Sequence, residues 1–140
     1  MLRILFIFII FFTSPILSNT FSIDMLNVRS DGQSMVYSED VLKVAVGDTV
    51  VWKPKDKGHN VEFIIGPDDI ELPKKSRINQ EFIYIFEKPG VYFYQCTPHK
   101  SMGMIAVVIV GNDLSNLDQV KSVRVFGKSK RKLEEILSLI

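Results

Sequence analysis

The sequence predicts an all-β protein, a sandwich or barrel of short strands followed by two C-terminal helices. Short runs of β-branched and aromatic residues recur between residues 21 and 110, and such runs favour strands. Turn-forming pairs such as Gly47-Asp48 and Pro89-Gly90 separate these runs. After Gly111 the apolar residues follow the three-or-four spacing that is typical of amphipathic helices.

Eight segments have the pattern of strands. Residues 21–28 alternate apolar and polar side chains, which indicates a half-buried strand. Residues 49–54 end at Pro54, which cannot donate to a strand ladder. The predicted strands cover residues 21–28, 35–37, 41–46, 49–54, 60–65, 82–86, 91–94 and 105–110.

Two helices are predicted near the C-terminus. Asp113 can cap a short helix that runs through Leu117. In the second, Leu133, Ile136, Leu137 and Ile140 share one face. We expect both helices to pack on the sandwich; the alternative for the second is a helix that binds a membrane or a partner.

The first 19 residues resemble a secretory signal peptide. Arg3 supplies a positive charge, residues 4–12 are unbroken Ile, Leu and Phe, and residues 13–15 interrupt the run. This run is shorter than the ~20 residues that a membrane-spanning helix needs. The sequence therefore predicts export with cleavage near residue 19, the alternative being an uncleaved N-terminal anchor.

The mature chain is predicted to divide into a β-sandwich domain, residues 20–111, and a helical extension, residues 112–140. Without Arg3, the 17 basic residues become 16 and equal the 16 acidic residues. A formally neutral domain argues against nucleic acid as a partner. Cys96 is the only cysteine, so an exported chain can use it as an inert core residue, an interchain disulfide or a metal ligand.

Residues 94–104 concentrate soft metal donors directly after a predicted strand. Cys96, His99, Met102 and Met104 lie on this loop, and His59 is the other of the two histidines. One thiolate, two imidazoles and a weak thioether are the ligands of a mononuclear copper electron-transfer site. Spacing alone allows either methionine. Four protein donors leave no open position for substrate, which favours an electron carrier over an enzyme.

The sequence around these donors resembles the pseudoazurins, blue (type 1) copper proteins of the cupredoxin family. The resemblance rests on Cys96-Thr97-Pro98-His99 followed by residues 102–106, on residues 57–62, on residues 25–27, on residues 47–50 and on residues 116–119. It covers essentially the whole mature chain. It implies a Greek-key β-sandwich with two C-terminal helices, one copper ion and a periplasmic location.

The resemblance also implies the ligand set. His59, Cys96 and His99 would bind copper, Met104 would be the axial ligand, and Met102 would be only a neighbour.

Three further residues would support the site by resemblance. Asn60 would tie the two ligand segments together through hydrogen bonds, and Met35 would lie against the exposed histidine. Pro98 would stiffen the loop and help to shape a dry docking face.

Lysines flank the predicted ligands. Lys55, Lys57 and Lys100 could form a basic docking ring, the alternative being an ordinary solvated surface. Lys100 stands where family members carry an aromatic residue, a departure that bears on the choice of partner and leaves the ligand set unchanged. By resemblance the partners are periplasmic redox proteins such as copper nitrite reductase or c-type cytochromes, and the protein is a monomer. The alternative function is periplasmic copper delivery or storage.

Overall fold

The computed structural model describes residues 17–140. Most of the predicted signal peptide, residues 1–19, lies outside the described residues, so export remains a prediction. Within the described part, no helix is both long and apolar enough to cross a membrane.

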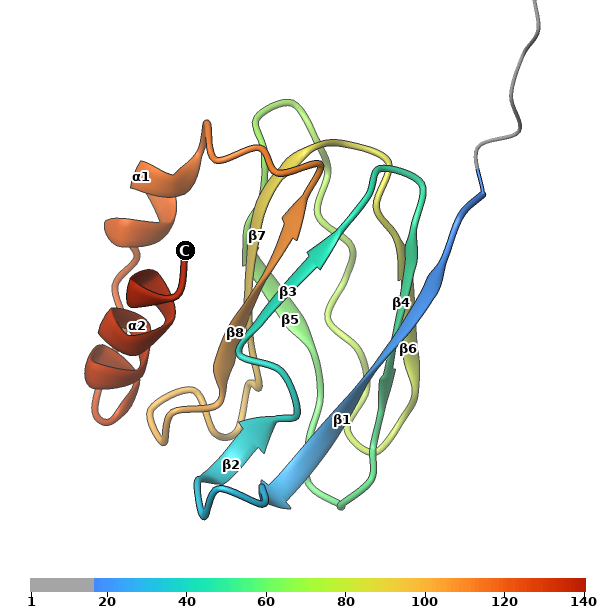
Figure 1. The fold of residues 1–140 in the computed structure, drawn as a ribbon. Helices are drawn as coiled ribbons and strands as arrows, with labels where there is room; N and C mark the ends of the chain where they lie inside the picture. Colours follow the sequence, from blue (N-terminus) through green and yellow to red (C-terminus); the bar gives the residue numbers. More distant parts are fainter. Residues whose placement is uncertain (1–16) are drawn as a thin grey trace, which may run out of the picture.

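Eight strands form two four-stranded sheets that face each other (Figure 1). One sheet has the order β2-β1-β4-β6 and the other β3-β8-β7-β5. Two separate sheets confirm the predicted sandwich and exclude a closed barrel for the described residues. The strands are β1 (Thr20–Val28), β2 (Ser34–Tyr37), β3 (Val41–Val44), β4 (Thr49–Lys53), β5 (Glu62–Ile65), β6 (Phe82–Ile85), β7 (Gly90–Gln95) and β8 (Ile105–Val110).

Two predicted strands are shorter than expected because side chains take over their backbone hydrogen bonds. β3 ends at Val44, since the backbone N–H of Ala45 donates to the Asp48 carboxylate at 2.7 Å. β5 begins at Glu62, since the N–H of Val61 donates to the Ser76 hydroxyl at 2.9 Å. His59 therefore lies in a loop before β5, and the loop after β5 holds this segment through Ser76.

The main core lies between the two sheets and contains the predicted inward-facing residues. Ile23 and Met25 of β1 and Trp52 of β4 are fully buried there. Every residue of β8 is buried, whereas Ile83 and Ile85 of β6 are exposed. The difference arises because helices cover the outer face of the β3-β8-β7-β5 sheet (Figure 1).

The covering helices are α1 (Leu117–Lys121) and α2 (Ser129–Ser138). Leu133 and Ile136 are buried against β7 and β8, as their shared face predicted. The prediction that Asp113 caps the first helix is wrong. α1 begins at Leu117, and the Asp113 carboxylate instead accepts the N–H of Ser115 at 2.8 Å, which closes a turn before the helix.

Candidate metal centre

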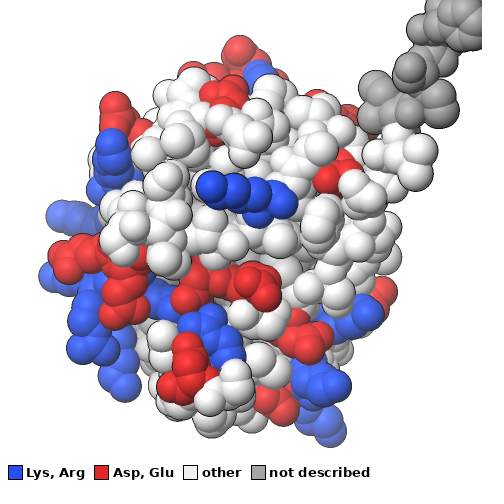
Figure 2. All heavy atoms as spheres, viewed as in Figure 1, with Lys and Arg blue, Asp and Glu red and all other residues white. Residues whose placement is uncertain are grey.

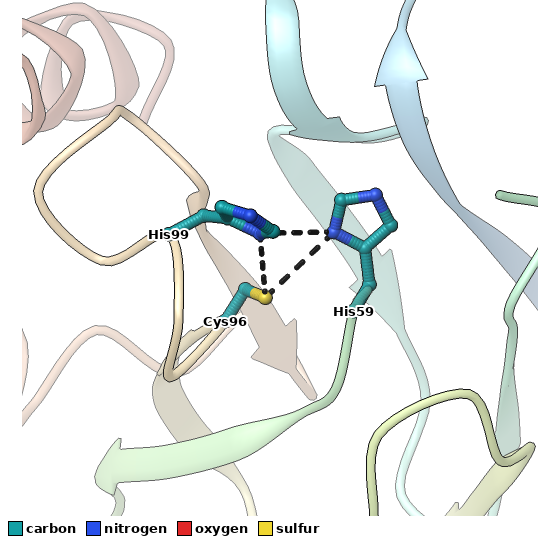
Figure 3. A group of neighbouring side chains, drawn as sticks. All are labelled: His59, Cys96 and His99. Carbon is teal, nitrogen blue, oxygen red and sulfur yellow. Dashed lines mark hydrogen bonds between the residues drawn. The ribbon is translucent and has the colours of Figure 1, made fainter. Parts of the chain in front are cut away.

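Three metal-binding atoms meet at one end of the sandwich. The Nδ1 atoms of His59 and His99 are 3.1 Å apart, and the Cys96 Sγ lies 3.8 Å from the first and 3.4 Å from the second. All three atoms lie within 4.8 Å of one another, and the side chains converge on the same point (Figure 3). The fold thus brings His59 against Cys96 and His99, which lie 37 and 40 positions further along the chain.

His59 is fully buried and its ring is fixed from β1. Its Nε2 lies 2.9 Å from the Asn27 Oδ1. A carbonyl oxygen only accepts, so Nε2 carries the proton and Nδ1 keeps its lone pair for a metal. Asn27 is itself held, because its backbone N–H donates to the Asp56 carboxylate at 2.7 Å. Asn27 lies in a segment that resembles the pseudoazurins, but sequence reasoning did not find this role for it.

Cys96 follows β7 directly, and the loop to β8 closes on itself. The N–H of Cys96 donates to the Met104 carbonyl at 3.0 Å, and the N–H of His99 donates to the Cys96 carbonyl at 3.1 Å. Gly103 has φ +108°, a conformation that glycine adopts without strain. The loop therefore presents His99 and returns Met104 beside Cys96 within nine residues.

Asn60 ties the two donor segments together. Its Oδ1 accepts the Thr97 N–H at 2.8 Å, and its Nδ2 donates to the Thr97 hydroxyl at 3.0 Å. That hydroxyl donates onward to the Glu62 carboxylate at 2.9 Å, which also accepts from Gln95 at 2.9 Å. The hydrogen bonds expected of Asn60 are present, whereas Thr97, Glu62 and Gln95 were not singled out from the sequence.

Burial sets the protonation of the three donors. Burial, followed by the neighbouring His99, lowers the pKa of His59, and burial lowers the pKa of His99. Both imidazoles are thus neutral near pH 7, as metal binding requires. Burial raises the pKa of Cys96, against backbone hydrogen bonds from Asn60 and His99. A metal must therefore displace the thiol proton when it binds.

The two candidate methionines have different environments. Met104 is fully buried in the main core beside Cys96, whereas Met102 is 43% exposed. The backbone does not separate them, since the N–H groups of Met102 and Met104 both donate to the His99 carbonyl, at 2.9 and 3.4 Å. Met35 packs partly buried against the same core and has φ +52°, which is unusual for a residue with a side chain.

The remaining predicted site residues lie at the surface. Pro98 is exposed, His99 beside it is half-buried, and Lys55, Lys57 and Lys100 are all exposed. One edge of the cluster is thus open to solvent through His99, while His59 and Cys96 are closed off.

The donor set fits copper. Thiolate and imidazole ligands, with a buried thioether beside them, suit Cu(I) and Cu(II), whereas Mg²⁺ and Ca²⁺ prefer oxygen ligands.

Comparisons with known proteins agree with this fit. Residues 24–111 match the model of the copper-binding proteins of the plastocyanin/azurin family. A putative pseudoazurin from Rhizobium leguminosarum bv. viciae is 40% identical over 120 residues, which span 84% of this chain and 78% of that one. A pseudoazurin from Methylorubrum extorquens is 36% identical over 130 residues, or 91% and 86% of the two chains.

Solved structures show the same fold. The crystal structure of native pseudoazurin from Hyphomicrobium denitrificans superposes with a TM-score of 0.80 at 34% identity, covering 86% of this chain and 98% of that one. The sandwich with two C-terminal helices is therefore the pseudoazurin form of the cupredoxin fold. The chain belongs to the plastocyanin/azurin family of copper-binding proteins, and its cofactor is a single copper ion.

Proposed function

We propose that the protein is a blue-copper electron carrier in which His59, Cys96, His99 and axial Met104 hold the ion. The observation that carries this proposal is the cluster of Nδ1, Sγ and Nδ1 atoms within 4.8 Å, which the chain holds by contacts of its own. Bound copper supplies a one-electron couple. The chain's part is to keep the donors in place, exclude water from Cys96 and expose one ligand edge.

A rigid donor frame suits electron transfer better than catalysis. Asn27 fixes one imidazole, and Asn60 fixes the cysteine end of the loop. A site that keeps its shape in both oxidation states needs little rearrangement for each electron. Hydrolytic metal sites keep one position open for water, whereas four protein ligands leave none. We therefore propose a carrier without enzymatic activity of its own.

The half-buried edge of His99 is the proposed contact with redox partners. A Cβ added to Gly58 would lie 3.8 Å from the His99 Cε1, which puts the segment next to Lys57 against this ring. Lys75 and Lys100 both lie close enough to Glu62 to lower its pKa. At the lower end of the face drawn in Figure 2, basic side chains lie on both sides with acidic side chains between them.

The positive charges of Lys57, Lys75 and Lys100 favour a partner with an acidic surface around its redox centre. We propose a periplasmic reductase such as copper nitrite reductase, or a c-type cytochrome, as the partner of a monomeric protein exported by residues 1–19. Oppositely charged surfaces raise association rates, and salt screens the effect.

A copper titration with visible spectroscopy tests the function. We expect one copper per chain and a strong thiolate-to-copper(II) band, and we expect Cys96→Ser to lose both the band and tight copper binding. Tight binding of Cu(I) with a colourless Cu(II) form would instead support copper delivery or storage. Retained blue colour in Cys96→Ser would refute the ligand assignment.

Ionic strength tests the docking surface. Electron transfer to a candidate partner should slow as salt rises, and Lys57→Glu with Lys100→Glu should slow it at low salt. Lys121→Glu is a matched control, because Lys121 is exposed on α1 at the other end of the sandwich (Figure 1). Rates that do not depend on salt would exclude a basic docking ring.

A further inference from the structure

The start of α2 is hydrogen-bonded to the loop that carries His99 and Met104. The Ser129 hydroxyl donates to the Lys100 carbonyl at 2.6 Å and accepts the Gly103 N–H at 3.1 Å. The N–H of Lys128 donates to the Ser101 carbonyl at 2.9 Å. Three backbone groups of the loop, on Lys100, Ser101 and Gly103, are thus bound by two adjacent residues of the C-terminal segment.

The two segments approach too closely for larger residues. Gly127 has φ +58°, and a Cβ there would lie 2.4 Å from the Ser101 carbonyl oxygen. Real Cβ atoms do not come this close to backbone oxygen, so a glycine at 127 is what lets the chain pass the loop before α2 begins. This fit indicates a specific contact between the segments.

Ser129 is fully buried. A buried N–H or carbonyl that loses its partner incurs a desolvation cost of about 1–3 kcal/mol. One hydroxyl satisfies one donor and one acceptor here, and it bridges Lys100, which follows His99, and Gly103, which precedes Met104.

The opposite end of the loop is held differently. Asn60 binds Thr97, next to Cys96, from the β5 side. The loop is therefore fixed at its cysteine end by one segment and at its His99–Met104 end by another, 69 positions further along the chain.

We propose that Ser129 is a positioning residue of the copper site, which fixes the His99–Met104 arc of the loop from the C-terminal helix. The inference rests on the proposed ligand set. Weak axial ligation tunes the reduction potential of such sites, so loosening this arc changes the bond of the ion to Met104 while leaving Cys96 and His59 in place.

Ser129→Ala tests the proposal, with Ser138→Ala as the matched control. Ser138 lies on the same helix, and its exposed hydroxyl donates only to Glu135 within the helix, at 2.6 Å. In the metal-free protein, we expect Ser129→Ala to speed hydrogen exchange of the Gly103 amide about fivefold or more, because the variant removes the hydrogen bond that this amide donates. Ser138→Ala should change it by less than about twofold.

The copper-loaded variants give a second readout. We expect Ser129→Ala to keep the thiolate-to-copper(II) colour but to change the relative intensity of its bands and to shift the reduction potential. Ser138→Ala should change neither the band intensities nor the potential. Unchanged bands, potential and Gly103 exchange in Ser129→Ala would overturn the proposal. A wild-type protein without blue colour would instead overturn the proposed function.

Wild-type protein provides a test that does not depend on the variant folding. If Ser129 binds the loop, the Gly103 amide exchanges as slowly as the amides of α2 in metal-free protein. Exchange of Gly103 near the rate of an unprotected amide would show that the hydroxyl does not hold the loop.

Discussion

The two segments that bring donors to the metal centre differ in how they meet solvent. The His59 segment is closed: the ring is fully buried and Asn27 binds its far nitrogen. The loop from Cys96 to Met104 is half-open, because His99 is partly exposed and Met102 is 43% exposed. Side-chain hydrogen bonds to backbone or ring atoms hold both segments, so the two segments differ in their exposure to solvent and not in how they are held.

This contrast assigns separate tasks to the two histidines. A buried ring bound on its far side can only hold the ion, whereas a partly exposed ring can hold it and also touch another protein. An electron carrier needs both properties in one site, since a fully closed site would be slow to exchange electrons and a fully open one would admit water. Four sets of substitutions test the site, in order of decreasing expected effect.

The largest effect is expected from removing either imidazole. His59→Gly and His99→Gly should both lose the blue colour, because each removes a strong ligand. Added imidazole should restore colour in His99→Gly, whose gap opens to solvent, and should fail in His59→Gly, whose gap is buried. The visible spectrum is the measurement. Equal rescue of both variants would contradict the difference in access.

Asn60→Ala should weaken the frame that joins the two segments. It removes two hydrogen bonds to Thr97 and one to the Ser76 carbonyl, at 2.8, 3.0 and 3.2 Å. We expect the free energy of unfolding of the metal-free protein to fall by about 2–3 kcal/mol, measured by urea denaturation. Gln119→Ala, which removes an exposed hydrogen bond to Asp68, should cost less than about 0.5 kcal/mol. Similar decreases in the free energy of unfolding of both variants would show that the Asn60 hydrogen bonds do not stabilise the fold.

The two methionines separate the closed and open parts of the loop. Met104→Leu should retain copper and raise the reduction potential, because removing a donor disfavours Cu(II) relative to Cu(I). Met102→Leu, at an exposed position, should leave the potential unchanged. Voltammetry measures both. A shift that follows Met102 would reassign the axial ligand.

The smallest effect concerns Glu62 and the stability of the fold at low pH. Burial tends to raise the pKa of Glu62, but hydrogen bonds from Gln95 and Thr97 and nearby Lys75 and Lys100 bring it below its ordinary value of 4.5. A lowered folded pKa stabilises the fold above pH 4.5, and this contribution is lost as pH falls through the folded value.

Glu62→Gln tests this contribution. The stability difference between metal-free wild type and the variant should shrink between pH 6 and pH 3.5 in urea titrations at each pH. Glu134→Gln, at an exposed position on α2, is the control and should follow the wild type. A difference that is constant across this range would contradict the lowered pKa.

The sequence predicted what local pattern and chemical type can encode. Alternation predicted the strands and their buried faces, and the face shared by Leu133 and Ile136 predicted how α2 packs. The lone cysteine, the two histidines and the methionines predicted the kind of metal. Strand ends at Val44 and Glu62 and the start of α1 were misplaced, because side chains of Asp48, Ser76 and Asp113 compete for backbone groups.

The supporting residues of the site were harder to predict. Asn27, Glu62 and Ser129 are ordinary polar residues in sequence, and each acquires its role only when the fold sets it against a distant segment. Asn60 was identified because it lies beside a ligand in a recognised motif. Long-range hydrogen bonds to loops have no periodic signature, so only the folded structure reveals them.

The burial of Cys96 has a consequence for the protein before it acquires its metal. The residue has no exposed surface, and burial raises the pKa of the Cys96 thiol, which disfavours the reactive thiolate. Both effects slow disulfide exchange at Cys96 in a folded chain that has not yet bound copper.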